Sequence, residues 1–332
     1  MTDHANDARP ASTRSGRLEI IDVSRGLALV AMAIYHFAWD LEFFGYAEPG
    51  MTAVGGWKIF ARCIASSFLF LVGVSLVLAH AKRLRTGPYL KRLAMVAGAA
   101  ALISLVTWFA VPGGFIFFGI LHQIALASVL GLAFLRLPWL VTALVAAAVI
   151  AAPHFLRSAL FDHPLLWWVG LSSSNPPSND YVPLFPWFGA VLAGISAAGL
   201  AARKGLFERL SRFETGRFSR PLAFAGRHSL AVYLIPQPVL IAAVALFSLV
   251  APAQWATPKG QFLSSCQASC EQSRNGAFCS VYCGCVLDRL EQENMLDAVF
   301  SGAQDETTRA RLNEIAGLCT ASTELGAPEE GE

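Results

Sequence analysis

Long apolar stretches, interrupted by short polar segments, make up most of the chain. A helix needs about 20 mostly apolar residues to cross a bilayer. Seven stretches meet or approach that length, and we place them at 24–44, 58–80, 90–111, 115–135, 138–153, 183–202 and 229–250. The fifth is short, so its ends are less sharply defined than the others. The pattern predicts an all-α fold, a polytopic membrane bundle of about seven transmembrane helices.

Both ends of the chain are polar. Residues 1–19 carry three arginines and no apolar run, and we expect them to be disordered and cytoplasmic. No small-residue cleavage pattern such as Ala-x-Ala follows the first apolar run, so we interpret it as a retained span and not as a cleaved signal peptide. Residues 20–252 then form the transmembrane domain, and residues 253–332 form a polar tail.

The composition supports a membrane protein. Of the 332 residues, 55% are hydrophobic and 14% are charged, and the mean hydropathy is +0.51. Soluble globular domains usually carry about 25% charged residues, so a soluble globule is excluded. The formal net charge of +2 gives no reason to expect nucleic acid as a partner. The partner that this composition predicts is the lipid bilayer, and the oligomeric state stays open.

Basic residues are unevenly distributed between the predicted loops. Cytoplasmic loops of membrane proteins carry an excess of Lys and Arg. With the N-terminus inside, the cytoplasmic loops hold Lys82, Arg83, Arg85, Lys91, Arg92, Arg136, Arg203, Lys204, Arg209, Arg212, Arg217, Arg220 and Arg227. The opposite loops hold little beyond Lys58, Arg62 and Arg157. We predict a bacterial inner-membrane protein with a cytoplasmic N-terminus and a periplasmic C-terminus. The 154–182 loop is then outside, where its aromatics, Trp167 and Trp168 among them, can lie at the interface as a lid or re-entrant segment.

The tail carries six of the seven cysteines, Cys266, Cys270, Cys279, Cys283, Cys285 and Cys319. An even number in a segment outside the cytoplasm favours disulfides. The spacing suits a helical hairpin bridged by Cys266–Cys283 and Cys270–Cys279, which leaves Cys285 for Cys319, although six cysteines allow fifteen pairings. The alternative is a metal site, but zinc sites usually separate their two cysteine pairs by a longer gap. We predict a small, disulfide-rich helical extension with no metal.

Two ionisable residues, His36 and Asp40, lie in the first predicted span. Four residues make about one helical turn, so both side chains lie on one face. Ionisable groups in a membrane are costly and usually face a bundle interior or a water-filled cavity. Histidine is suited to be a general base or proton shuttle, and Asp40 would orient its tautomer. The alternative is a histidine that is hydrogen-bonded to a neighbouring helix for packing.

Three more polar residues fall near the depth of His36. With the predicted topology, His122 lies in the outer half of the fourth span, Asp180 precedes the sixth span, and Arg62 enters near the outer end of the second. Two histidines, two carboxylates and an arginine are therefore candidates for one site. Another polar residue, Gln237, lies between two prolines within the seventh span, where a helix kink explains it as well as a substrate channel does.

A second polar group lies at the predicted inner face. Asp22 and Arg25 begin the first span, and Arg227 and His228 begin the seventh. Asp22 and Arg25 are three residues apart and can pair on one helical face. A structural ion pair at the membrane interface is therefore an alternative to a functional role for these two residues.

Five blocks of sequence stand out, Ile21-Asp22-x-x-Arg25-Gly26, Tyr35-His36-Phe37-x-x-Asp40-Leu41, Phe118-Gly119-Ile120-Leu121-His122, Pro183-Leu184-Phe185-Pro186-Trp187-Phe188-Gly189 and Gly226-Arg227-His228-Ser229-Leu230-x-x-Tyr233-Leu234. In this order they resemble the bacterial relatives of heparan-alpha-glucosaminide N-acetyltransferase, a family of multi-span transmembrane acyltransferases. The resemblance runs from about Leu18 to Pro252 and does not cover the cysteine tail. Two departures are Pro236, where the family has a histidine before Gln-Pro, and the absence of histidine from 41–56, the loop that carries the proposed catalytic histidine of the lysosomal members.

The resemblance implies transfer of an acyl group, in the first place acetyl, from cytoplasmic acyl-CoA to an amine or hydroxyl of a periplasmic or envelope glycan. Residues 20–252 are then an acyltransferase-like domain whose acetyl-CoA is a co-substrate and not a permanently bound cofactor. The phosphates of CoA would be held by basic side chains, namely Arg25, Arg83, Arg85, Arg227 and His228. The catalytic group would be His36, Asp40 and His122, and the acceptor would be bound by Asp180, Arg62 and Gln237.

His36 is assigned as the base from its depth and not from the family, and it would either deprotonate the acceptor or carry the acyl group itself. Two other classes of function stay open. Buried His and Asp residues also make the proton relays of transporters, although no inverted repeat stands out in the sequence. A structural or sensory membrane protein whose tail binds a partner is the third interpretation.

Overall fold

The computed structural model describes residues 18–80, 83–174, 176–211, 216, 219–251, 253, 258–271, 274–296, 299 and 305–326. The predicted disordered segment lies outside this range except for its last two residues. Lys82, Arg212 and Arg217 of the predicted basic loops also lie outside it.

The described chain is helical and contains the predicted spans. Five helical segments are long and apolar enough to cross a membrane, namely α1 (Glu19–Phe43), α2 (Gly55–His80), α3 (Thr86–Ala110), α6 (Leu184–Arg203) and the Ser229–Ser248 segment, which comprises α9 (Ser229–Leu234) and α10 (Pro236–Ser248). Two predicted spans are shorter apolar helices, α4 (Ile120–Gly131) with η3 (Leu132–Phe134), and α5 (Trp139–Phe155). The all-α membrane bundle is therefore confirmed.

The fourth helix begins later than the sequence predicts. The sequence predicts a helix from 115, but α4 begins at Ile120, after Gly119 in an extended conformation. Residues 114–118 instead form backbone hydrogen bonds to 179–182, from the Asn179 amide to the Gly114 carbonyl (3.1 Å) and from the Val182 amide to the Phe118 carbonyl (3.0 Å). The tertiary pairing satisfies polar backbone groups that a helix would otherwise satisfy.

The remaining elements are short helices in the connections and the helices of the tail. The connections hold η1 (Met51–Ala53), η2 (Pro112–Gly114), η4 (Ala159–Asp162), η5 (Pro164–Val169), α7 (Leu206–Leu210) and α8 (Arg220–Arg227). The tail holds α11 (Pro258–Cys270), α12 (Gly276–Gln292) and α14 (Glu306–Gly326).

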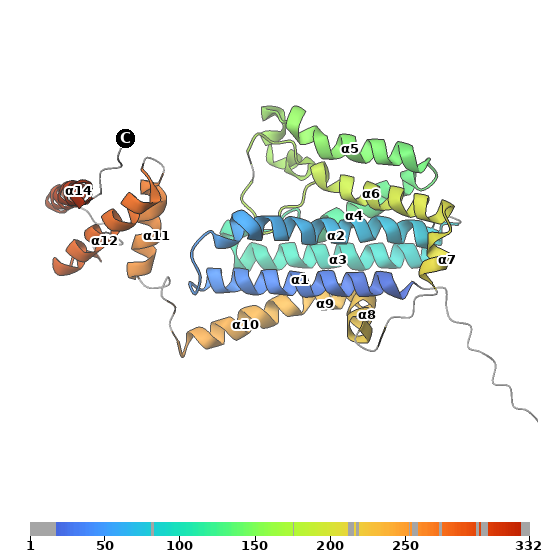
Figure 1. Ribbon diagram of the computed structural model, residues 1–332, viewed down its shortest axis with the longest axis horizontal. Coiled ribbons are helices and arrows are strands. Elements are labelled where there is room, and N and C mark those ends of the chain that lie inside the picture. Colours follow the sequence, from blue (N-terminus) through green and yellow to red (C-terminus); the bar gives the residue numbers. More distant parts are fainter. Residues whose placement is uncertain are drawn as a thin grey trace, which may run out of the picture. The chain divides into compact units, whose positions relative to one another are not determined.

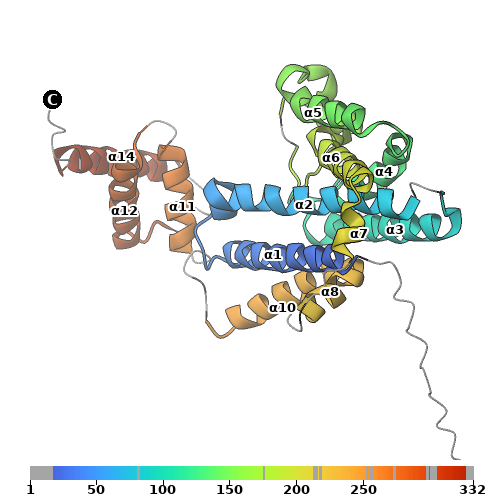
Figure 2. The ribbon, with the colours of Figure 1, turned by 45° about the vertical axis from the view of Figure 1, so that its right-hand side comes forward.

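The chain divides into two compact units. The first unit comprises Met1–Ala33 and Ile59–Ile235, and the second comprises Ile34–Lys58 and Pro236–Glu332. In the first unit α5 lies along α6, as Figures 1 and 2 show, and α4 packs between α3 and α6.

Close helix packing in the first unit depends on small residues. A Cβ on Gly73 of α2 would overlap the Val191 carbonyl of α6, and a Cβ on Gly194 of α6 would overlap the Phe70 carbonyl of α2. The two backbones therefore touch, a common arrangement in membrane helix pairs. The side chains of Leu69 and Leu192 fill the adjacent core with no exposed surface.

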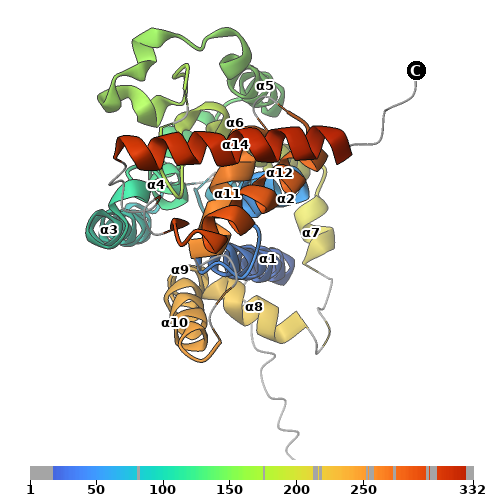
Figure 3. The same ribbon diagram turned by 90° about the vertical axis from the view of Figure 1, so that its left-hand side faces the viewer.

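The tail is a disulfide-bonded helical structure. Cys266–Cys283 and Cys270–Cys279 join α11 to α12, and Cys285–Cys319 joins α12 to α14, which crosses it in Figure 3. Val286, Leu290, Ile315 and the Cys319 sulfur form its buried core. The predicted hairpin and its pairing are confirmed, and the alternative metal site is not formed by these cysteines.

Candidate active site

The carboxyl group of Asp40 lies fully buried on α1. Its Oδ1 accepts a hydrogen bond of 2.8 Å from Nε2 of Gln237 on α10, while Asp40 Oδ2 and Gln237 Oε1 have no partner among the described residues. Asp40 was expected to orient His36, but no hydrogen bond between these two is formed in the described chain. The short Asp side chain is engaged instead by the amide of Gln237. Gln237 donates to Asp40 through its amide nitrogen, and its expected contact with substrate stays a prediction.

The imidazole of His36, one turn earlier on α1, is partly buried. It lies edge-on to Tyr35, with 6.1 Å between the ring centroids. Within the described part of the chain its ring nitrogens make no hydrogen bond. The ring of His36 is therefore not engaged by a hydrogen bond in these residues, which suits a general base.

The loop after α1 is held by a residue that the sequence reasoning missed. Glu42 accepts hydrogen bonds from the amide of Gly50 (2.7 Å) and from the amide and hydroxyl of Thr52 (2.8 and 2.6 Å). Gly50 has a φ of 81°, which a glycine adopts readily. A carboxylate at the end of the apolar run, a few residues before Pro49-Gly50, is the signal that predicts such a closed loop.

His122 uses both of its ring nitrogens within the protein. Nδ1 accepts a hydrogen bond of 3.2 Å from the Gly119 amide, and Nε2 lies 3.2 Å from the Ser104 hydroxyl. Ser104 donates its own hydrogen to the Ile116 carbonyl at 2.6 Å. The hydroxyl can therefore only accept from Nε2–H, which assigns the tautomer. His122 joins α3 to the start of α4, and its catalytic role stays a prediction.

The carboxylate of Asp180 contacts the same turn at the start of α4. Its Oδ2 accepts a hydrogen bond of 2.9 Å from the Ile120 amide, the first of the helix. Gly119 must lack a side chain here, because a Cβ would overlap the Asp180 carboxylate. Burial raises the pKa of Asp180 to about 6, against the opposing effect of the Ile120 hydrogen bond. The structure thus brings together two of the predicted residues, His122 and Asp180.

Aromatic rings from two loops surround this turn, and we call Phe117, Phe118, Trp167, Trp168 and Tyr181 the aromatic cluster. Phe117 lies 5.5 Å from Trp167 and 5.6 Å from Tyr181, and Phe118 lies 6.3 Å from Trp168, between ring centroids. The Tyr181 hydroxyl donates to the Trp167 carbonyl at 2.7 Å. Burial raises the pKa of Tyr181 to about 12. The loop between α5 and α6 therefore packs against the segment that precedes α4.

Two other polar residues, Arg62 and Gln123, differ in their burial. Arg62 is exposed on α2 and forms no ion pair with Asp180. Gln123, next to His122, is fully buried, and neither its amide nitrogen nor its oxygen has a partner among the residues that the structure describes. Sequence reasoning missed Gln123, although an amide within an apolar span is itself a signal of function.

The inner group contains a buried ion pair. Arg25 Nη1 lies 3.1 Å from Asp22 Oδ1, and Arg25 Nη2 also donates to the Ser75 hydroxyl of α2. A Cβ on Gly226 of α8 would overlap the Asp22 carbonyl, and a Cβ on Gly26 would overlap Leu222. The Asp22–Arg25 pair that the spacing allows is therefore formed, and the roles of both residues stay predictions.

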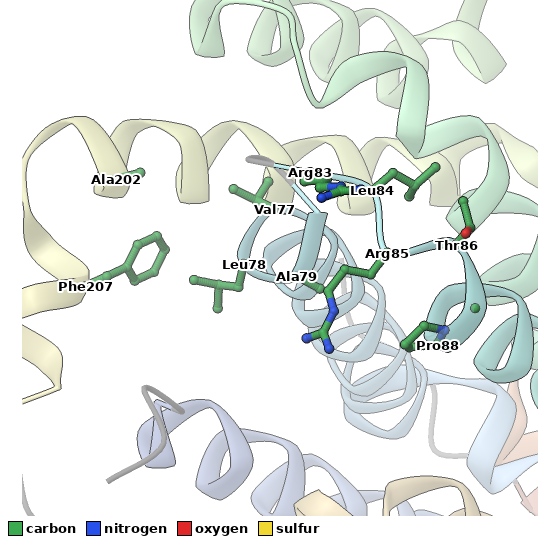
Figure 4. A pocket seen from close by; sticks show the side chains of 11 residues that line it. Val77, Leu78, Ala79, Arg83, Leu84, Arg85, Thr86, Pro88, Ala202 and Phe207 are labelled. Carbon is green, nitrogen blue, oxygen red and sulfur yellow. The ribbon is translucent and has the colours of Figure 1, made fainter. Parts of the chain in front are cut away.

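A cavity of about 730 Å³ lies where α2 ends and α3 begins. Figure 4 shows Arg83 and Arg85 in its wall, with Phe207 of α7 across the space from Leu78. The other lining residues are Val77, Ala79, Leu84, Thr86, Gly87, Pro88 and Ala202. Two of the five residues expected to bind CoA are therefore brought together. Arg227 and His228 are exposed and do not line it, and His228 Nδ1 donates to the Phe224 carbonyl at 3.0 Å.

The cavity and the His122 turn are associated with opposite ends of α3. Thr86 lines the cavity and Ser104 holds His122, and the 18 residues between them span about 27 Å of helix axis. That distance is close to the thickness of the hydrocarbon core, about 30 Å.

No group of His, Cys, Asp and Glu side chains in the described ranges is arranged to hold a metal ion.

These features define a polytopic membrane protein whose first unit has a basic cavity at one end of α3 and the hydrogen-bonded His122 at the other. The profile of one protein family, described as heparan-alpha-glucosaminide N-acetyltransferase, catalytic, matches residues 17–238. The match covers about two thirds of the chain, and the chain belongs to this family. The family indicates a membrane acetyltransferase type of function. Comparison with curated proteins and with solved structures found no match.

Proposed function

We propose that the protein transfers an acetyl group from cytoplasmic acyl-CoA to an amine or hydroxyl of a glycan on the far side of the inner membrane. Membership of the acetyltransferase family carries this proposal. Three structural features support it, the basic cavity, the unengaged His36 ring and the aromatic cluster beside Asp180.

The basic cavity is the proposed entrance for the acyl donor. CoA carries several phosphates, and the planar guanidinium groups of Arg83 and Arg85 can each form paired hydrogen bonds to a phosphate. The apolar walls, which include Leu78 and Phe207, offer contact area to the adenine ring. A volume of about 730 Å³ is in the usual range of small-molecule sites.

His36 is the proposed base. Its free ring nitrogen takes the proton of the acceptor N–H or O–H while that atom attacks the thioester carbonyl. The tetrahedral intermediate then collapses with cleavage of the C–S bond, and the thiolate of CoA receives the proton from the imidazolium. In the alternative course His36 attacks the thioester first, releases CoA and passes the acyl group to the acceptor. Both courses balance without any other reactant.

Asp40 and Gln237 are proposed to assist beside this base. Asp40 Oδ2 and Gln237 Oε1 are buried acceptors without partners in the described chain. Such atoms are costly unless a water or ligand donor reaches them. A hydroxyl or amine of the incoming acceptor supplies that donor. In this proposal Asp40 acts on the substrate and not on the tautomer of His36.

The aromatic cluster and Asp180 are the proposed acceptor-binding surface. Aromatic faces provide contact area to the apolar faces of a sugar, and a carboxylate accepts hydrogen bonds from its hydroxyls. Trp168 is partly exposed and packs near Phe118, so part of its ring is accessible to an acceptor.

The three disulfides of the tail support a periplasmic C-terminus, because disulfides persist in oxidising compartments.

The test is acyl transfer by the purified protein in nanodiscs. Radiolabelled acetyl-CoA is incubated with it and with an envelope extract, and label on a glycan supports the proposal, while label on the protein indicates the covalent course. His36→Ala should abolish transfer. His154→Ala, at an exposed position at the end of α5, is the matched control and should keep it. Full turnover by folded His36→Ala would remove His36 from the mechanism.

A further inference from the structure

The connection after α5 exposes large apolar side chains. Phe155, Leu160 and Leu165 are 82%, 73% and 77% exposed, and Leu156 and Trp168 are also exposed. They lie on the last turn of α5, on η4 and on η5. Exposed apolar patches of this kind usually mark a protein or membrane interaction surface. We call residues 155–169 the apolar loop.

The apolar loop is folded, so this exposure does not reflect a missing core. Asp162 accepts hydrogen bonds from the Ser172 hydroxyl (2.5 Å) and the Ser173 amide (2.8 Å). The Trp167 indole donates to the Asp162 carbonyl at 2.9 Å, and the Ser158 amide donates to the Leu171 carbonyl at 3.1 Å. The hydrogen bonds from Ser172 and Ser173 lower the pKa of the Asp162 carboxyl group, the Ser172 hydroxyl first among them. Polar groups thus bond within the loop while the leucines face outward.

The outward face continues a surface that faces lipid. Leu140, Leu144 and Ile150 are exposed along the apolar helix α5, and the hydrocarbon core is the environment that solvates such side chains favourably. Seventeen residues of helix span about 26 Å. The last turn of α5 therefore comes to the boundary of the hydrocarbon core, and the next residues fall at the depth of the headgroups.

We propose that the apolar loop lies in the interfacial layer of the bilayer, with Phe155, Leu160 and Leu165 inserted at the boundary of the acyl chains. Tryptophans are enriched at this depth because their rings are amphipathic. Trp167 and Trp168 lie at the end of the loop, where they pack against Phe117 and Phe118 of the aromatic cluster and leave the leucines to contact lipid. Arg157 is exposed in the same segment and can pair with lipid phosphate. The occupant of this surface is lipid. The proposal does not depend on the transferase activity.

The test is the depth of a spin label in nanodiscs. Cys63 is the free cysteine of the described chain, and the three disulfides protect the tail, so a Cys63→Ala background accepts one new label. Labels are placed at Leu160→Cys and, separately, at Leu165→Cys. The matched control is Ser174→Cys, an exposed polar position beyond the loop. Collision rates with oxygen, which dissolves in lipid, and with a water-soluble nickel chelate are compared.

The ratio of oxygen to nickel collisions should be several-fold higher at both leucine positions than at Ser174→Cys. A ratio at both leucine positions equal to that of the control would place the loop in water and overturn the proposal. Spectral broadening that disappears on dilution with unlabelled protein would identify a second copy of the chain as the occupant, and would also overturn it. One label per chain by mass spectrometry, and an unchanged melting temperature, confirm that each variant is folded.

Discussion

Gln237 Nε2 lies 2.8 Å from Asp40 Oδ1 and joins α10 to the buried carboxyl group of α1. The two residues are 197 positions apart in the chain. Their hydrogen bond leaves one oxygen of each side chain without a partner in the described residues. Asp40 therefore bonds to Gln237 and not to His36, and its second oxygen is a candidate for contact with substrate.

The Asp40–Gln237 bond should have a measurable effect on stability. Gln237→Leu leaves a buried carboxyl group without its donor, which should destabilise the protein by about 1–3 kcal/mol. The double variant Asp40→Leu with Gln237→Leu should lose less than the sum of the single changes, because removing both polar partners removes the unsatisfied group. Thermal unfolding in one detergent checks this. Simple additivity would show that the two side chains are not coupled.

The hydrogen bonds of His122 predict a structural effect. Ser104→Ala removes the acceptor of Nε2–H and should lower stability by about 1 kcal/mol. If His122 only positions α3 against α4, the pH profile of acyl transfer should stay the same, since the Ser104–His122 hydrogen bond then takes no part in proton transfer. Ser67→Ala, at an exposed position of α2, is the control, because the Ser67 hydroxyl donates to the Cys63 carbonyl of its own helix. A shifted pH profile would return His122 to the catalytic group.

Asp180 predicts a pH dependence of stability. Burial raises its pKa from 3.8 to about 6, so the folded state favours the protonated form. The resulting stabilisation is fully present below pH 4 and is lost as the pH rises through about 6. Asp180→Asn should remove this contribution. The difference in melting temperature between the two proteins should change between pH 4 and 7. A constant difference would contradict the raised pKa.

The contact of α8 with α1 predicts that Gly226 is needed. Gly226→Ala places a Cβ against the Asp22 carbonyl, and such overpacking should cost about 1–3 kcal/mol. Gly98→Ala on α3 is the matched control, because nothing lies within 4 Å of its new Cβ. That change should stabilise by roughly 0.5–1 kcal/mol, since alanine is the better helix former. Equal melting temperatures for the two variants would argue against the contact.

The disulfide pairing predicts a thiol count and a ranking. Alkylation of denatured, non-reduced protein should modify one cysteine, Cys63, and reduction should expose seven. Loss of Cys285–Cys319, with a sequence separation of 34, should cost about 4 kcal/mol by the loop-entropy estimate. Loss of Cys270–Cys279, with a separation of 9, should cost about 3 kcal/mol. Seven free thiols without reductant would contradict both the pairing and a periplasmic tail.

The candidate site was only partly predictable. Depth in the membrane identified His36, Asp40, His122 and Asp180, because buried polar residues are conspicuous in an apolar span. Which of them meet was not predictable, since helix rotation decides whether His122 contacts Ser104 or another neighbour. Arg62 shows this limit, because the sequence predicts it at the depth of the site but the residue is exposed in the structure.

The sequence by itself determined the membrane helix bundle, its approximate spans and a disulfide-rich helical tail, and the cysteine spacing favoured the pairing that forms. Those features follow from local composition and from spacing along one chain, and hydrocarbon thickness and helix pitch convert them directly into structure. Only the tertiary structure decided that Gln237 binds Asp40, that Asp180 and His122 share one turn of α4, and that Arg83 and Arg85 line a cavity. Each of these contacts joins residues from different elements, and its geometry depends on how the helices rotate and pack.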